Sequence, residues 1–308
     1  MTTDEQPRDA PTNATDAPDI ETGRYLYCIV QANEDATLET TGIDGESVSV
    51  VTEDGIGAVV HDCDSLYDSA DLTQIQHWLV RHQTVVDAAG QAFGTPVPFQ
   101  FDTILRGDDT RLREWLREES ETLRPVLSEL ADHWEYRIEV VEFDAPDDRT
   151  LVEQDDRLAE LDEQIADASE GQAFLLEKQF EQRLTELRTA RRETMAAELE
   201  ADLAETVREV HTLERSPASD IADVARAEGE TGAEGGDDAE TLCRLTVLAH
   251  EDDEDAVGSI LDGVAAEDGL EVRFTGPWPP YTFAPELGTD PDGQNGDPTG
   301  VGTDMGPL

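Results

Sequence analysis

Few residue types in this chain are spaced as a reactive site would require. His61 and Cys63 are two positions apart and could share one face of a strand, but a zinc site needs about four ligands and no others lie nearby in sequence. His77 and His82 are five positions apart, so a helix would place them on different faces. The sequence contains no G-x-S-x-G elbow, Walker loop or H-E-x-x-H pair. We therefore predict no catalytic residues, no metal site and no bound cofactor.

The other chemistry available is recognition by rigid aromatic side chains, which is concentrated in Thr275–Phe283, here called the Pro-aromatic segment. Its prolines remove backbone donors and fix φ, so we expect the preceding strand to stop and no helix to begin. One interpretation is a stiff exit from a sheet, with Trp278 and Tyr281 capping the core. The other is a docking surface, because rigid rings lose little conformational entropy on binding.

Charge dominates the composition. Acidic residues number 73 against 21 basic residues, a formal net charge of −52, and Lys178 is the only lysine. No basic stripe is available to neutralise phosphates, which argues against nucleic acid as a partner. No stretch approaches the roughly 20 apolar residues that span a bilayer, and the polar N-terminus lacks the apolar region of a signal peptide. Apolar periodicities nevertheless run through most of the chain, so the composition indicates a folded cytoplasmic protein of a halophile.

The elements that must position these side chains form two groups. The first opens with a strand over 24–30, whose nearly continuous apolar character is typical of a central strand. Alternating patterns, turn chemistry and capping aspartates predict the rest of this group: strands over 47–51 and 56–61, a helix from Asp71, a strand over 97–101, a helix from Asp108 and a closing strand over 136–141. We therefore expect an N-terminal α+β domain over 23–145, preceded by a disordered acidic tail over 1–22.

The second group is a C-terminal domain over 146–283. Apolar residues at helical spacing predict a helical hairpin over 150–212, which packs on its own domain or offers a partner helix to another subunit. The other expected parts are a short helix over 216–227, a flexible acidic insertion over 228–240, a β-α-β unit over 241–283 and a disordered tail over 284–308. The expected fold class is α+β, with two small domains of a ferredoxin-like variant and the long hairpin between them or packed on the second.

Several sequence blocks resemble those of one protein family. They are Tyr25–Cys28, Gly55–Val60, Val97–Thr103, Glu170–Leu176 and Gly276–Tyr281, the last being the most specific. On these blocks the region 24–283 is similar to the gas vesicle protein F/L (GvpF/GvpL) family, and the length and acidic composition resemble its haloarchaeal L-type members. Asp102 departs from the pattern, because family members often carry glycine there.

This resemblance implies a non-enzymatic accessory or minor structural protein of gas vesicle formation, located at the gas vesicle and in the cytoplasm. The implied partners are the hydrophobic shell protein of GvpA type and other accessory gas vesicle proteins, with no nucleic acid and no membrane. Candidate interaction residues are Trp278, Pro279, Pro280, Tyr281, Phe99 and Phe101, and the helical hairpin is a further candidate surface. The alternatives are a small-ligand-binding or enzymatic α+β module and a generic acidic scaffold protein.

The net charge generates a prediction about salt. Self-repulsion of this size destabilises a compact state in dilute buffer, whereas in roughly molar salt the Debye length falls to about 3 Å and screens it. We expect the protein to unfold or expand at low salt, measured by circular dichroism in dilute buffer and in molar KCl. Identical spectra in the two buffers would contradict this expectation.

Overall fold

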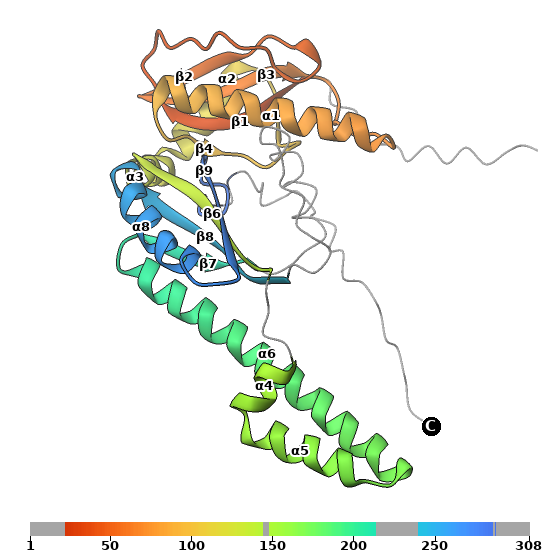
Figure 1. Ribbon diagram of the computed structural model, residues 1–308. Helices are drawn as coiled ribbons and strands as arrows, with labels where there is room; N and C mark the ends of the chain where they lie inside the picture. The colour runs from red at the N-terminus through yellow and green to blue at the C-terminus, as the bar shows by residue number, and fades with distance from the viewer. Residues whose placement is uncertain (1–21, 144–147, 214–239, 286, 288–308) are drawn as a thin grey trace, which may run out of the picture.

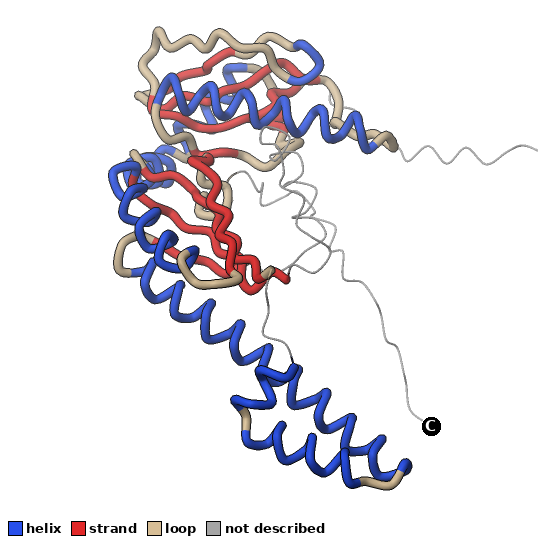
Figure 2. Tube along the Cα trace, in the orientation of Figure 1, coloured by secondary structure: helices blue, strands red, loops and turns tan. Residues whose placement is uncertain are grey.

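The structure is a computed structural model that describes residues 22–143, 148–213, 240–285 and 287. Helices combine with two antiparallel sheets, which confirms the α+β fold class (Figures 1 and 2). Each sheet is the centre of one structural unit, and the two units lie one above the other in Figure 1. The short helix expected over 216–227 lies outside the described residues, as do nearly all of the insertion over 228–240 and of both tails.

The first unit is built on a sheet with β1 at its centre. Its elements are β1 (Gly23–Gln31), β2 (Ser49–Glu53), β3 (Ile56–Cys63), α1 (Leu72–Phe93), β4 (Val97–Pro98), β5 (Ile104–Arg106), α2 (Asp109–Glu118) and α3 (Ser120–Leu130). The strand order is β2-β3-β1-β4, with β5 also paired to β1, so β1 is central as its apolar sequence predicts. β4 keeps only the first two residues of the strand expected over 97–101, and β5 is not predicted from the sequence.

Local signals in the sequence set the ends of these elements. The Asp71 carboxylate accepts a hydrogen bond from Thr73 N at 3.0 Å, and that of Asp108 accepts one from Thr110 N at 2.9 Å, so both predicted N-caps are confirmed. The turn between β2 and β3 has positive φ at both central residues, 49° at Asp54 and 83° at Gly55. Such turns match the twist of the strands they join, as the sequence predicts here.

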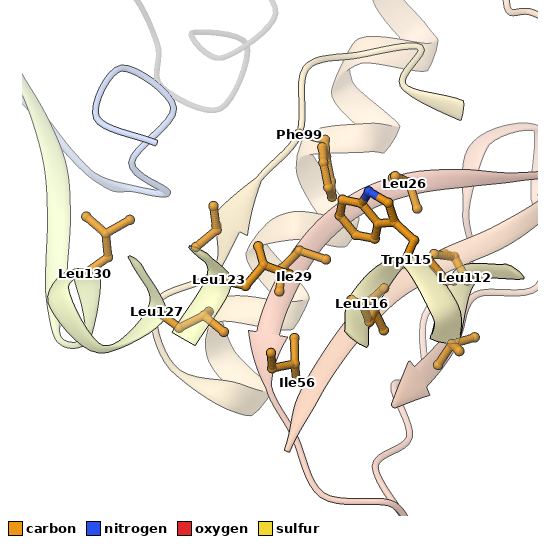
Figure 3. Packing of buried hydrophobic residues seen from close by; sticks show 14 of the residues in the cluster. Leu26, Ile29, Ile56, Phe99, Leu112, Trp115, Leu116, Leu123, Leu127 and Leu130 are labelled. Carbon is orange, nitrogen blue, oxygen red and sulfur yellow. The ribbon is translucent and has the colours of Figure 1, made fainter. Parts of the chain in front are cut away.

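Helices cover both faces of the first sheet. A β-bulge between Leu26 and Cys28 interrupts the alternation of β1. As a result Tyr25, Tyr27, Cys28 and Val30 pack with α1, whereas Leu26 and Ile29 pack with α2 and α3. Figure 3 shows this second cluster, which includes Leu26, Ile29, Ile56, Leu112, Trp115, Leu116, Leu123 and Leu127. The α1 face therefore carries the tyrosines, and the opposite face is a mainly aliphatic core that also holds the rings of Trp115 and Phe99.

The strand expected to close the first sheet over 136–141 belongs instead to the second sheet. β6 (His133–Glu142) pairs with β8 (Glu240–His250) on one side and with β9 (Leu270–Trp278) on the other. The order is β7-β8-β6-β9, where β7 is Glu209–Thr212. The local sequence cannot reveal this pairing, because both partners of β6 come from far along the chain. We propose that the two units meet at residues 131–132 rather than at 145.

The second unit has the ferredoxin-like chain order. Its first crossover contains α4 (Asp148–Gln154), α5 (Asp156–Asp167) and α6 (Glu170–Ala204), and its second is α8 (Glu254–Ala265). The sequence β6-α6-β7-β8-α8-β9 on a sheet ordered β7-β8-β6-β9 is the βαββαβ arrangement. The helical hairpin is therefore an enlargement of the first crossover of this unit.

The long helix α6 has two different environments. Its C-terminal part packs on the second sheet through Leu199 and Leu203, whereas its N-terminal part runs away from the sheet beside α5 (Figure 1). Arg191 on α6 forms an ion pair with Glu142 at the end of β6. The hairpin expected over 150–212 ends at Ala204, because residues 209–212 pair with β8 as the edge strand β7. None of the helices in the described ranges has the length and apolar character needed to cross a membrane.

Leu203 tests the packing of α6 on the sheet. Its side chain is 0% exposed in the core of the second unit. Leu203→Ala removes buried methyl groups and leaves a cavity, so the free energy of unfolding should fall by about 2–4 kcal/mol in molar KCl. Leu72→Ala is the matched control, because Leu72 is 69% exposed and its truncation should cost about 0.5 kcal/mol or less. Equal losses in the two variants would contradict this packing.

Candidate interaction surfaces

The Pro-aromatic segment starts inside a strand. β9 continues to Trp278, past the point where the prolines predict that it stops, because it is an edge strand and a bulge opposite β6 absorbs Gly276 and Pro277. Trp278 lies opposite Glu135, and its indole Nε1 donates to Thr275 Oγ1 at 3.4 Å. Gly276 has φ of 138°, and a Cβ there would lie 2.7 Å from the Tyr136 ring. Glycine is therefore required at this position by both backbone and space.

A buried carboxylate holds the segment beyond Trp278. Glu135 is 1% exposed. Its Oε2 accepts from Thr282 N at 2.8 Å, and its Oε1 accepts from Thr282 Oγ1 at 3.0 Å. Arg137 Nε donates to the same Oε1 at 3.4 Å and supplies a compensating charge. The Glu135 carboxylate thus fixes where the chain goes after the prolines.

The remainder of the segment lies between the two units. Pro279 and Pro280 are buried, and the Tyr281 ring centre lies 6.5 Å from that of His82 on α1. Phe283 contacts His211 of β7, with ring centres 4.8 Å apart, and also packs against the aliphatic core of the first unit. The segment therefore bridges the second sheet to the first unit, which is the arrangement that a core-capping role requires.

The two phenylalanine candidates of the first unit are in different clusters. Phe99 is 3% exposed, and its ring lies beside that of Trp115 with centres 6.2 Å apart (Figure 3). Phe101 is half-buried on the α1 face, with its ring centre 6.1 Å from that of His82. The structure thus brings Phe101 and Tyr281 together around His82, while Trp278 is held within its own strand. Which of the six candidates contacts a partner remains a prediction.

His61 and His82, to which the sequence patterns assign no role, form the polar core of the first unit. Tyr27 Oη accepts from Ile43 N at 3.0 Å and also shares a hydrogen bond with His61 Nδ1, 2.8 Å away. His61 Nε2 shares a second hydrogen bond with Tyr67 Oη at 2.9 Å. Both ring nitrogens of His61 are therefore paired with tyrosine hydroxyls.

A parallel chain of hydrogen bonds runs through Tyr25. Its Oη accepts from Asp102 N at 3.1 Å and donates to His82 Nδ1 at 2.8 Å, and His82 Nε2 donates to the Phe99 carbonyl at 3.2 Å. The loop from Phe99 to Asp102 is therefore held at both ends by one tyrosine and one histidine. Asp102 has φ of 65°, the conformation that glycine adopts at least cost, and its carboxylate accepts from Tyr67 N at 3.0 Å. That bond accounts for an aspartate at this turn.

Burial shifts the acid–base behaviour of this polar core. Desolvation lowers the pKa of His61 from 6.5 to about 4, and it raises the pKa values of Tyr25 and Tyr27 far above their usual range. All three groups are therefore neutral at physiological pH. In the described part of the chain no group of three or more His, Cys, Asp and Glu side chains is arranged to hold a metal ion.

The sequence carried a signal for this network. Tyr25 and Tyr27 stand on one face of a strand predicted to be buried, and a buried tyrosine hydroxyl needs a hydrogen-bond partner. Histidines on the neighbouring strand and on the following helix are suitable partners. When the histidines are compared only with one another, as metal ligands, the tyrosine–histidine pairs do not emerge.

Comparison with known proteins covers nearly all of this fold. The family model described as gas vesicle synthesis protein GvpL/GvpF matches residues 23–285. Gas vesicle protein L1 of Halobacterium salinarum is 44% identical over 284 residues, which is 92% of this chain and 97% of that protein. Gas vesicle protein L of Haloferax mediterranei is 38% identical over 298 residues, with 86% of this chain and 88% of that protein covered.

Solved structures with the same fold share little sequence. The crystal structure of gas vesicle protein GvpF from Anabaena has a TM-score of 0.64 at 18% identity, covering 86% of this chain and 98% of that chain. That of GvpF from Microcystis aeruginosa has a TM-score of 0.58 at 17% identity, covering 85% and 99%. The architecture described above is therefore shared with these two proteins.

The lowered pKa of His61 predicts a pH dependence of stability. Its folded pKa of about 4 lies below the unfolded value of 6.5, so the unfolded chain binds the extra proton and stability falls as pH drops through this window. Between pH 6.5 and 5.0 the wild-type protein should lose about 1.5 kcal/mol more than His61→Gln, which cannot titrate there. Urea unfolding in molar KCl at both pH values measures the difference. The same pH slope in both proteins would contradict a buried neutral His61.

Proposed function

The chain belongs to the GvpL/GvpF family of gas vesicle synthesis proteins, and from that premise we propose that it is a non-enzymatic accessory protein of gas vesicle assembly. The observation that carries the proposal is the family match over residues 23–285, which leaves almost none of the described chain outside it. Relatives at 38–44% identity are named gas vesicle proteins of the L type. The proposed locations are the growing gas vesicle and the cytoplasm around it.

We further propose that the protein binds the hydrophobic shell protein and other accessory proteins. A shell subunit with a large apolar surface would aggregate before it polymerises unless a soluble partner covers that surface. A chain with a net charge of −52 has the strongly hydrated exterior that such a partner needs. The aromatic groups proposed for this contact are Trp278, Tyr281 and Phe101, all only partly buried. Phe99, Pro279 and Pro280 are buried and would support these three rather than meet the partner.

Deletion of the gene tests the assembly role. We expect cells without the protein, and without a redundant homologue, to lack normal gas vesicles in electron micrographs. Restoring the full-length chain should restore them. Normal vesicles in the deletion strain would overturn the assembly role and favour the generic acidic scaffold or the small-molecule module as the function.

Trp278→Ala tests the proposed contact residue. We expect the variant to keep its circular dichroism spectrum in molar KCl and to capture the shell protein at least about tenfold less well in a pull-down at that salt. Phe143→Ala is the matched control, because it removes another aromatic side chain, 57% exposed at the end of β6, and should leave capture unchanged. Loss of folding in Trp278→Ala would assign the residue to core capping. Full capture by a folded variant would exclude it from the contact.

A further inference from the structure

The tip of the helical hairpin carries the most exposed apolar cluster on α6. Phe174 and Leu175 are 58% and 61% exposed, although they lie within the block Glu170–Leu176. Single exposed leucines are common on protein surfaces, but two adjacent large apolar residues are unusual in a chain whose charged residues make up 31% of the total. Their exposure follows from the geometry of the hairpin.

The two helices of the hairpin are packed together at its base, far from the turn between α5 and α6, and are less covered at its tip, near that turn. Leu158, Leu161 and Leu184 are buried between α5 and α6, and the Arg183 guanidinium donates to Asp155 Oδ2 at 2.8 Å. Asp155 also caps α5, because its carboxylate accepts from Leu158 N at 2.9 Å. Toward the tip, α5 ends at Asp167. Leu175 of α6 is 61% exposed there, in contrast to the buried leucines at the base. The contacts at the base thus hold α5 and α6 together where the groove begins.

The groove at the tip is lined by two leucines, by glutamines and by carboxylates. Its volume is about 650 Å³. α6 contributes Leu175 and Leu176 together with Gln172 and Gln179, all at helical spacing on one face, and α5 contributes Glu160, Glu163, Gln164 and Asp167. An amphipathic helix with an apolar stripe and basic flanks complements both surfaces, because its stripe would cover the leucines while its lysines or arginines meet the carboxylates.

A second copy of this chain fits the groove less well. The same face of another hairpin would bring its own Glu160, Glu163 and Asp167 against the first set, and like charges at contact are repulsive. In molar KCl, where the Debye length is about 3 Å, charge acts only between groups in contact. The leucines must then supply most of the affinity, and the carboxylates mainly select the sign of the partner.

We propose that the groove between α5 and the N-terminal part of α6 is a docking site for a basic amphipathic helix of a partner protein. The site is distinct from the Pro-aromatic segment and does not depend on which protein Trp278 contacts. It gives the hairpin a role besides that of a crossover connection in the second unit.

Binding of a synthetic amphipathic peptide to the full-length protein tests the site. The probe is a fluorescent peptide with leucines at i, i+3, i+4 and i+7 and lysines elsewhere, followed by fluorescence anisotropy in molar KCl. Leu175→Glu should weaken binding at least about tenfold, because it replaces one of the two leucines of the groove with a carboxylate. Leu72→Glu is the matched control, since Leu72 is 69% exposed on α1, and it should leave binding unchanged. Both positions are exposed, so both variants should keep their circular dichroism spectra.

A charge reversal separates this site from general attraction to an acidic protein. Glu163→Lys combined with Asp167→Lys should weaken the lysine peptide about threefold and strengthen a glutamate-flanked peptide by a similar factor. Equal weakening by Leu175→Glu and Leu72→Glu, or no effect of either, would overturn the proposal. A dimer in sedimentation analysis that Leu175→Glu abolishes would assign the groove to a second copy instead. Shell-protein capture through Trp278 is a separate readout, so failure of one result leaves the other intact.

Discussion

The arrangement of the two units depends on one carboxylate that is hidden from solvent. Glu135 stands at the start of β6, and its two oxygens accept from the backbone and the hydroxyl of Thr282. A buried carboxylate is costly unless its lone pairs are used, and here donors of Thr282 and Arg137 use them. By fixing Thr282, Glu135 places Tyr281 near His82 and Phe283 against the aliphatic core of the first unit. In a protein covered with carboxylates, the one that organises the junction is withdrawn from the surface.

The acidic composition also affects the conformation of the backbone at turns. The described non-glycine residues with positive φ are Asp44, Asp54, Asp102 and Asp132. Aspartate tolerates this conformation better than most residues, because its short carboxylate bonds to nearby backbone groups. Asp44 and Asp102 use their carboxylates in addition, accepting from the Trp78 indole at 2.8 Å and from Tyr67 N at 3.0 Å. Acid enrichment thus serves turn geometry and internal hydrogen bonding as well as hydration of the surface.

Features with a local cause were predictable from the sequence, and features with a distant cause were not. Asp71, Asp108 and the Asp54–Gly55 turn act on neighbouring residues, so their effect is readable from a few positions. The central place of β1 followed from its unbroken apolar character. The membership of β6 in the second sheet depends on strands far along the chain, and the role of Glu135 depends on Thr282. The tyrosine–histidine pairs were predictable from the sequence, because a buried tyrosine hydroxyl needs a hydrogen-bond partner.

The length of α6 has a mechanical consequence. At 1.5 Å per residue its 35 residues form a rod of about 50 Å, rooted at one end by Leu199 and Leu203 in the second sheet. A rod rooted at one end acts as a lever, so a tilt of about 5° at the root displaces the far end by about 4 Å. It also acts as a spacer, because its length sets the distance between a partner bound at the tip of the hairpin and the second sheet. A small change in the packing of Leu199 and Leu203 would therefore move the far end of α6 by several times as much.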